Sequence, residues 1–280
     1  MYTYRQQGGW QLANRVGTIR GRLVPAASGG IFGGPAGEFA VDFGASGEAG
    51  LFKLVSDMPG MVDSKVGLAS IWFHMPASAN RALMTVDPSN AIEDYFRITI
   101  DNSRRLLVVA RNPGGGTGIT FVGSNSVLVA LNAWHHILVS WDTAQDVIYA
   151  YLDDVDAWTG AVTNNITLDF EVAYNEHVDN EVQIAGGDLI GNPLLDCLGQ
   201  FWFDSNQFLD ITIEANRRRF TEADGSPIAL GPDGSTPTGV QPLLYFENPV
   251  QSYHVNRGSG GNFTVFGTPA NCDDTPADQF

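Results

Sequence analysis

Short runs of alternating hydrophobic and polar residues recur along most of this 280-residue chain. In Tyr95–Ile100, the side chains of Phe96, Ile98 and Ile100 alternate with polar ones and share one face of an extended strand. Runs of the same kind predict further strands at 38–43, 68–75, 82–86, 106–110, 119–122, 166–173, 181–185, 199–204, 243–246 and 263–266. Many short strands with almost no helix are typical of a β-sandwich or a barrel.

The clearest strand pair lies within residues 133–152, AWHHILVSWDTAQDVIYAYL. Two runs rich in β-branched and aromatic residues are joined by a bend with Asp142 and Asp146, which predicts a β-hairpin. His135 and His136 are neighbours on the first strand and face opposite ways, so they cannot hold one metal ion together. We interpret His135 as a half-buried histidine with its hydrogen bonds satisfied. Four tryptophans are assigned to the core: Trp72, Trp134, Trp141 and Trp202.

One segment departs from the strand pattern. Asp210–Phe220, DITIEANRRRF, predicts a short helix with Asp210 as its N-cap, Glu214 early and three arginines in the last turns. We interpret the arginines as a solvated helix end that matches the helix dipole. The alternative is an anion site.

Composition narrows the class of protein. The chain is 44% hydrophobic and 11% aromatic, which is enough for a sizeable core. Its net charge is −16 and lysine occurs only at 53 and 65, so nucleic acid is not an expected partner. No apolar window of about 18 residues predicts a membrane span. The first residues lack the apolar region of a secretory signal, which predicts synthesis in a cytoplasm.

The pattern divides the chain into three regions. Residues 36–232 are expected to form the sandwich with its short helix, and residues 233–280 a C-terminal extension that packs partly on it and ends in a frayed acidic tail. Residues 1–35 form a glycine-rich N-terminal arm, which we expect to pack against another chain in an assembly. The apolar residues assigned to that contact are Trp10, Leu12, Val16, Ile19 and Leu23.

The hairpin, with its Trp-His-His and Tyr-x-Tyr-Leu-Asp-Asp strands, resembles the central hairpin of laminin-G-like domains. These belong to the concanavalin A-like lectin/glucanase superfamily, so the resemblance implies an all-β jelly-roll sandwich. Residues 199–239, GQFWFDSNQFLDITIEANRRRFTEADGSPIALGPDGSTPTG, resemble a block found in proteins of tailed bacteriophages and prophages. Together the two resemblances cover about residues 37–268 and imply a virion-associated protein of the tail or the capsid surface.

A catalytic constellation is not apparent. The Glu-x-Asp-x-Glu strand of the related glucanases is missing, and the nearest pairs are Asp169 with Glu171 and Asp154 with Asp156. Two residues on one strand face are about 6.6 Å apart, which permits glycosidase chemistry without indicating it. Phe170 between the first pair favours an ordinary strand with a polar outer face. There is also no nucleophile elbow and no P-loop, so we predict that the chain is not an enzyme.

Acidic residues suggest one candidate metal site. Asp153, Asp154 and Asp156 form the densest local cluster, and calcium prefers such oxygen ligands. A solvated acidic loop is the alternative reading. No cofactor other than calcium is expected.

Sugar binding requires exposed aromatic rings with polar groups nearby. The candidates are Trp158, Tyr174 and His177, which lie in predicted loops or at strand ends. Packing of Trp158 beneath a loop is the alternative.

Two cysteines are too few for a disulfide scaffold. We interpret Cys197 as a core thiol, and whether it ever pairs with Cys272 stays open.

The first functional hypothesis is a structural component of a tailed-phage virion, as a capsid decoration or tail protein. It would be made in the cytoplasm of a bacterial host and would contact other virion proteins and copies of itself. The second is a lectin-like module that recognises host surface glycans. The third, a glycoside hydrolase, is disfavoured because the carboxylate triplet is absent.

Overall fold

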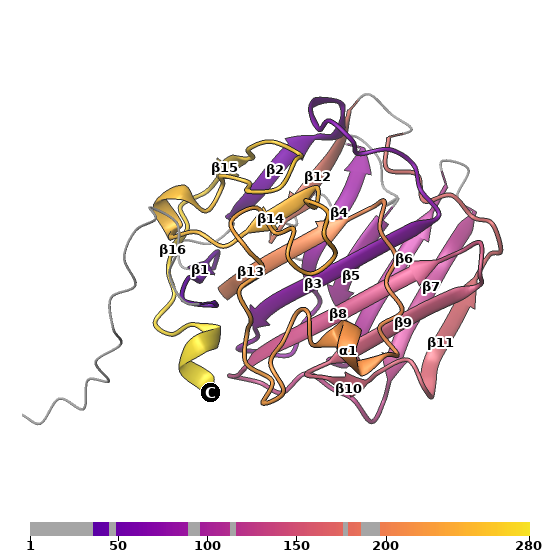
Figure 1. The fold of residues 1–280 in the computed structure, drawn as a ribbon, viewed down its shortest axis with the longest axis horizontal. Helices are drawn as coiled ribbons and strands as arrows, with labels where there is room; N and C mark the ends of the chain where they lie inside the picture. Colours follow the sequence, from indigo (N-terminus) through magenta and orange to yellow (C-terminus); the bar gives the residue numbers. More distant parts are fainter. Residues whose placement is uncertain (1–35, 45–48, 89–95, 113–115, 176–178, 186–196) are drawn as a thin grey trace, which may run out of the picture. The chain divides into compact units, whose positions relative to one another are not determined.

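The computed structural model describes residues 36–44, 49–88, 96–112, 116–175, 179–185 and 197–280, which belong to one compact unit (Figure 1). Among these residues, no helix is both long and apolar enough to span a membrane. Several predicted site residues lie outside the described ranges: Trp10, Leu12, Val16, Ile19, Leu23 and His177. Their predictions are therefore untested.

Sixteen described strands form two eight-stranded antiparallel sheets. Sheet A has the order β10-β9-β8-β3-β13-β1-β16, with β14 beside β13, and sheet B has the order β11-β7-β6-β5-β4-β12-β2-β15. The strands of sheet A are β1 (Val41–Asp42), β3 (Val66–His74), β8 (Trp134–Asp142), β9 (Val147–Leu152), β10 (Val155–Asp156), β13 (Cys197–Asp204), β14 (Leu244–Phe246) and β16 (Ala270–Asn271). Those of sheet B are β2 (Gly50–Leu54), β4 (Arg81–Pro88), β5 (Phe96–Ile100), β6 (Leu106–Arg111), β7 (Thr117–Ser124), β11 (Ala161–Ile166), β12 (Asn180–Ile184) and β15 (Thr264–Phe266).

The described helices are short. They are α1 (Glu214–Arg217) and the 3-10 turns η1 (Val55–Asp57), η2 (Val250–Ser252) and η3 (Pro276–Gln279). The prediction of an all-β, jelly-roll sandwich with one short helix is thus confirmed.

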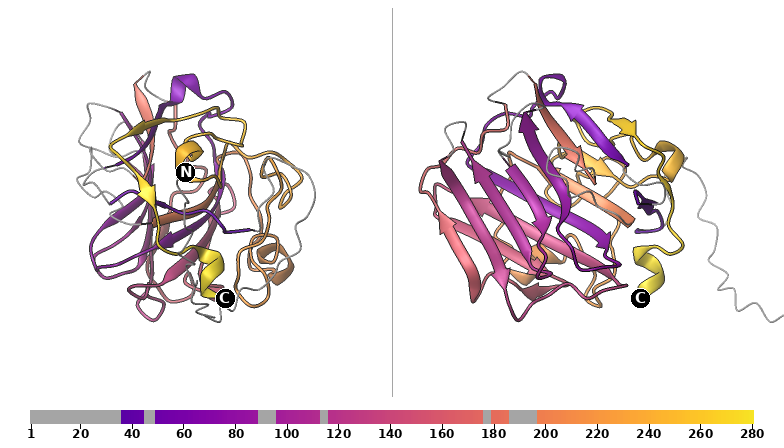
Figure 2. Two further views of the ribbon diagram at one scale, coloured as in Figure 1. Left: turned by 90° about the vertical axis from the view of Figure 1, so that its left-hand side faces the viewer. Right: turned by 180° about the vertical axis from the view of Figure 1, so that it is seen from behind.

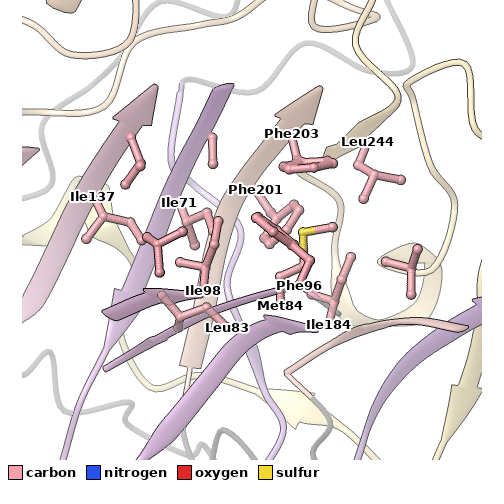
Figure 3. Packing of buried hydrophobic residues seen from close by; sticks show 14 of the residues in the cluster. Ile71, Leu83, Met84, Phe96, Ile98, Ile137, Ile184, Phe201, Phe203 and Leu244 are labelled. Atoms are coloured by element: carbon pink, nitrogen blue, oxygen red, sulfur yellow. The ribbon is translucent and has the colours of Figure 1, made fainter. Parts of the chain in front are cut away.

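The core lies between the two sheets and follows the predicted alternation. Ile71 of β3 and Ile137 of β8 are directly opposite in register, and both point into this core. From sheet B, Phe96 and Ile98 face them, as Figure 3 shows. Burial of each large apolar side chain is worth about 1.5–3 kcal/mol. The four tryptophans assigned to the core are all buried, as predicted: Trp72, Trp134, Trp141 and Trp202.

Sheet A is also covered on its outer face. Leu138 and Trp202, on two of its strands, pack in one cluster with Ile211, Phe220 and Leu230, which follow β13 in the chain. In Figure 1 the orange segment that carries α1 lies in front of β8 and β9, and Figure 2 shows this layer from the side. All nine residues of β8 are buried as a result. A sheet buried on both faces requires near-continuous apolar strands, which is what the sequence of this hairpin provides.

Two local predictions were wrong. The strand predicted at 166–173 ends at Ile166, because the chain turns at Asp169, which has a φ of 59°. Residues 167–171 lie outside any strand, so Asp169 and Glu171 do not share a strand face, and Asp169 binds Lys65 with 3.1 Å between carboxylate oxygen and Nζ. The helix is also shorter than 210–220: Asp210 Oδ1 accepts a hydrogen bond from the backbone of Thr212 (3.0 Å) and so forms a turn instead of a cap.

The acidic tail, which was expected to fray, is held in place. A disulfide joins Cys197 to Cys272, so Cys197 is not a lone thiol. β16 pairs with β1 beside this bond, and Thr275 and Asp278 form a capping box on η3. The end of the chain is therefore part of the folded unit.

Candidate functional site

A cavity of about 220 Å³ lies at one end of the outer face of sheet A. Strands β3 and β8, the β9–β10 turn, the loop after α1 and the C-terminal residues each contribute to it. Its described lining residues are Trp72, Ala133, Trp134, His135, His136, Asp153, Asp154, Thr221, Asp224, Gly225, Gln279 and Phe280. We call this cavity the acidic aromatic pocket.

The floor of the pocket is formed by Trp72 and His136, which are opposite in the β3–β8 register. Their rings are 4.9 Å apart at 32°, and His136 Nε2 lies 2.8 Å from Ser70 Oγ. Burial, only partly countered by Asp153 and Asp154, lowers the pKa of His136 to about 4. His136 is therefore a neutral ring at pH 7. Ser70 is buried and does not line the pocket, so it is not placed as a nucleophile.

One wall begins at the tight turn between β9 and β10. Asp153 and Asp154 both have positive φ, at 51° and 61°, a conformation that aspartate tolerates in two-residue hairpins. Asp153 accepts hydrogen bonds from His136 N–H (2.8 Å) and from His135 Nδ1 (2.6 Å). The second nitrogen of His135 lies 2.9 Å from the carbonyl oxygen of Ala130. Both ring nitrogens of His135 therefore have hydrogen-bond partners within the protein. The prediction that the hydrogen bonds of His135 are satisfied is confirmed, but the residue is buried and not half-buried.

The second carboxylate of the turn, Asp154, is held by two arginines. Its oxygens accept from Arg217 Nε and Arg218 Nη2, each at 2.5 Å. Burial alone would raise the pKa of Asp154, but these hydrogen bonds and charges outweigh it and hold the pKa below its usual range. Arg217 also lies over the ring of Tyr151, 4.3 Å from its centroid. Arg217 and Arg218 therefore connect α1 to sheet A through their ion pairs with Asp154. The prediction that the arginines form a solvated helix end was wrong.

The rim opposite is a turn formed by Asp224, Gly225 and Ser226. Asp224 Oδ1 accepts from the backbone N–H (3.0 Å) and hydroxyl (2.7 Å) of Ser226, which lowers the pKa of this exposed carboxyl. Gly225 has a φ of 90°, and a Cβ added there would lie 3.3 Å from the ring of Phe280. The turn and the C-terminal aromatic ring are therefore in contact.

The last residues close the pocket. Gln279 binds the backbone of Trp134 twice: its Oε1 accepts from the N–H (2.7 Å) and its Nε2 donates to the carbonyl (3.2 Å). Phe280 then packs edge-on against Trp72, with ring centroids 6.0 Å apart. This wall depends on a segment that the Cys197–Cys272 bond ties to β13.

The pocket combines aromatic surface with carboxylate acceptors. Phe280 is exposed, and the indole N–H groups of Trp72 and Trp134 have no hydrogen-bond partner within the described protein. Carboxylates accept from hydroxyl groups, and aromatic rings pack on the C–H face of a sugar. The arrangement suits a small polar ligand that is rich in hydroxyl groups.

The three aspartates that were predicted to bind calcium each form hydrogen bonds with different residues of the protein. Asp156 accepts from the backbone N–H groups of Trp158 and Thr159 (2.9 Å each), away from the bonds of Asp153 and Asp154. In the described part of the chain, no three residues among His, Cys, Asp and Glu are grouped so that they could hold a metal ion. Calcium binding therefore stays a prediction, and two of its three residues line the pocket.

The predicted sugar-stacking residues are not brought together. Tyr174 is completely buried and packs on Phe96 with ring centroids 5.3 Å apart, so its ring is unavailable to a ligand and that prediction was wrong. Trp158 is half-buried and meets Tyr149 edge-on at 5.3 Å, the packing that was its alternative. The aromatic residues that line the pocket are Trp72, Trp134 and Phe280; the two tryptophans are also buried, and only Phe280 exposes its ring. Their sequence pattern indicated core or tail, and only the fold brings them to one cavity.

Comparison with known proteins supports the fold. No protein-family model matches the chain, and no curated protein matches its sequence. A solved structure from Bacteroides ovatus, provisionally named as a carbohydrate-binding protein, aligns with a TM-score of 0.56 and 11% identity over 86% of this chain and 61% of the other. Mouse laminin α1 domains LG4-5 align with a TM-score of 0.44 and 13% identity over 68% of this chain and 48% of the other. A CBM40 of the Ruminococcus gnavus IT-sialidase, bound to α2,6-sialyllactose, aligns with a TM-score of 0.44 and 14% identity over 64% and 98%.

These similarities define the class of fold. The alignment with the Bacteroides ovatus structure shows that the chain shares the β-sandwich fold of that protein. The same sandwich carries many functions, so the function has to be argued from the pocket.

Proposed function

We propose that this chain is a carbohydrate-binding module and that the acidic aromatic pocket holds its ligand. The observation that carries the proposal is the combination of aromatic rings and three carboxylates around one cavity of about 220 Å³. Protein sites for small ligands are concave, with aromatic walls and a few convergent polar groups. The fold of the Bacteroides ovatus protein adds support at the level of architecture.

The size of the pocket limits the ligand. At about 30 Å³ for each water molecule in the liquid, a cavity of about 220 Å³ has the volume of roughly seven waters. That space suits one sugar ring or the end of a chain and is too small for several rings. We therefore expect recognition of a terminal residue of a glycan.

The charges favour binding over hydrolysis. A glycosidase needs one carboxylic acid whose pKa is raised, so that it can protonate the leaving group. The pKa values of Asp154 and Asp224 are shifted in the opposite direction, below the usual range. Both are therefore ionised at neutral pH, where they can accept hydrogen bonds but cannot donate a proton.

The experiment is a glycan array followed by calorimetric titration of the full chain with the glycans that it selects. Asp224→Ala removes a rim acceptor that is exposed and makes few internal contacts, so it is expected to weaken binding without unfolding the protein. Asp233→Ala is the matched control, because Asp233 occupies the same kind of turn with Ser235 and does not line the pocket. Equal affinity in the two variants would show that the ligand binds elsewhere.

A role in a phage particle is a second proposal, supported by the resemblance of residues 199–239. In this chain the block supplies α1, part of the layer over sheet A, and the pocket residues Thr221, Asp224 and Gly225. Mass spectrometry of purified particles, with copies counted against the major capsid protein, tests this proposal. Absence of the chain from clean particles would reject it and leave glycan binding untouched.

A further inference from the structure

The acidic aromatic pocket presents hydrogen-bond acceptors to a ligand. The arginines nearest to it are already bound to one of its own carboxylates. Three carboxylates line it, and no lysine or arginine is among its described lining residues. Arg217 and Arg218 reach Asp154 without lining the cavity themselves. A ligand inside therefore meets carboxylate oxygens and no guanidinium group.

The two histidines do not change this balance. Both ring nitrogens of His135 are occupied, one by Asp153 and one by the carbonyl of Ala130. His136 is buried against Trp72 with Nε2 bound to Ser70. His135 has no free ring nitrogen and His136 is neutral at pH 7, whereas the strong hydrogen bonds to a carboxylate come from charged donors.

The three aspartates of the pocket differ in their hydrogen-bond partners, and Asp224 is the one that is bound by neither an arginine nor a histidine. Asp153 is bound to His135, and Asp154 is bound to two arginines. Asp224 binds only the neutral groups of Ser226, and no described cation pairs with it. Its negative charge therefore has neither an arginine nor an imidazole bound to it, and it acts on any charge that a ligand brings within a Debye length of about 10 Å.

We propose that the acidic aromatic pocket selects sugars rich in hydrogen-bond donors, either neutral or bearing an ammonium group, and rejects uronic and sialic acids. This proposal rests on the proposed glycan-binding function. The hydroxyl or ammonium groups donate to the carboxylates, while the apolar face of the sugar ring packs on the exposed ring of Phe280. A carboxylated sugar places two negative charges together with no donor between them.

The experiment compares sugars that differ only in charge. The full chain, with its disulfide intact, is titrated at pH 7 with the methyl glycosides of galactose, galactosamine and galacturonic acid, and with the corresponding glucose and mannose series. We expect the amino sugar to bind at least as tightly as the neutral one, and the acid at least tenfold more weakly. Sialyllactose is expected to behave as an acid.

The outcomes separate the two proposals. If an acidic sugar binds as tightly as its neutral counterpart, selection by charge is overturned while glycan binding stands. If no sugar of any series, and no glycan on the array, binds, then the proposed function itself fails.

A charge-neutral variant tests the assignment to one residue. Asp224→Asn is expected to narrow the ratio of amino-sugar to acidic-sugar affinity several-fold, and added salt is expected to narrow it in the wild type. Asp233→Asn, in the matched turn away from the pocket, is expected to leave the ratio unchanged. An unaltered ratio in Asp224→Asn would overturn the role given to Asp224.

Discussion

Two turns of identical sequence, Asp224-Gly225-Ser226 and Asp233-Gly234-Ser235, lie nine residues apart in this chain. In both, the aspartate Oδ1 accepts from the serine N–H and hydroxyl, and the glycine has a positive φ, 90° in the first and 78° in the second. Local sequence therefore produces the same backbone twice.

Their surroundings differ. Gly234 is buried: its carbonyl accepts from the indole N–H of Trp202 at 2.8 Å, and a Cβ there would lie 2.9 Å from the ring of Tyr245. Gly225 lies at the rim of the pocket with only the ring of Phe280 near it. The first turn is thus open to a ligand, while the second fastens the C-terminal layer to sheet A. Local residues set the shape of each turn, and the rest of the fold decides its use.

The largest effect is expected from the disulfide, which holds the segment that packs against the first turn. The bond closes a loop of 75 residues, so Cys272→Ser should lower the free energy of unfolding by about 4 kcal/mol. Hydrogen exchange should then quicken in residues 270–280 and 221–226 but much less in 231–236. Urea titration and exchange mass spectrometry measure these two changes.

The double variant Cys197→Ser/Cys272→Ser controls for a free thiol and should match the single one. Equal loss of protection in both turns would contradict a role for the disulfide specific to the pocket. A disulfide of this kind is typical of an oxidising environment, so binding should be measured without a reducing agent.

A second large effect is expected from the floor of the pocket. The folded-state pKa of His136 is about 4, below its unfolded value near 6.5, so the unfolded chain binds the extra proton first. Stability should therefore fall by about 3 kcal/mol as the pH drops from 6.5 to 4, before either turn aspartate is protonated. Urea unfolding at a series of pH values in wild type and His136→Gln measures this. An equally steep decline in the variant would place the titration elsewhere.

The sequence predicted most of the sandwich, because its strands carry a local signal. Alternation placed Phe96, Ile98 and Ile100 in the core, and the aromatic hairpin placed β8 and β9 as neighbours. β2 was missed, since Lys53 interrupts its short apolar run. The alternation of hydrophobic and polar residues does not predict a strand that is held extended mainly by pairing with its neighbours.

Most of the pocket could not be predicted from the sequence. Asp153 and Asp154 were identified from their clustering, but as ligands of calcium. Trp72 is more than half the chain away from both Asp224 and Phe280, and their proximity depends on packing of the C-terminal layer. The disulfide was left open for the same reason: Cys197 lies in an apolar run, and only the pairing of β16 with β1 brings Cys272 to it.

An intermediate effect is expected from glycine substitution in the two turns. Gly234→Ala adds a clash with Tyr245 and Pro242 to the strain of a positive φ, so it should cost about 2–3 kcal/mol of unfolding free energy. Gly225→Ala meets only the exposed ring of Phe280 and should cost about 1 kcal/mol. Chemical denaturation of both variants gives the two values. If Gly225→Ala proved the more costly, the open turn would be the structural one and the comparison would be reversed.

The smallest effect is expected from Asp224→Asn and Asp233→Asn. Hydrogen bonds from serine hold the pKa of each carboxyl below its unfolded value. Each therefore contributes stability that is present above the unfolded pKa, near 4, and is lost as the pH falls through the lower folded pKa. Because Asp224 is exposed and Asp233 is partly exposed, both variants should show only a slight loss of melting temperature at pH 7, and none at the acidic end.

Saturating ligand should separate them, since ligand adds stability only in proportion to its affinity for the folded state. Wild type and Asp233→Asn should gain equally in melting temperature, and Asp224→Asn should gain less. Equal gains in all three proteins would mean that the two turns differ in position but not in function. The assignment of Asp224 as a carboxylate that binds the ligand would then be wrong.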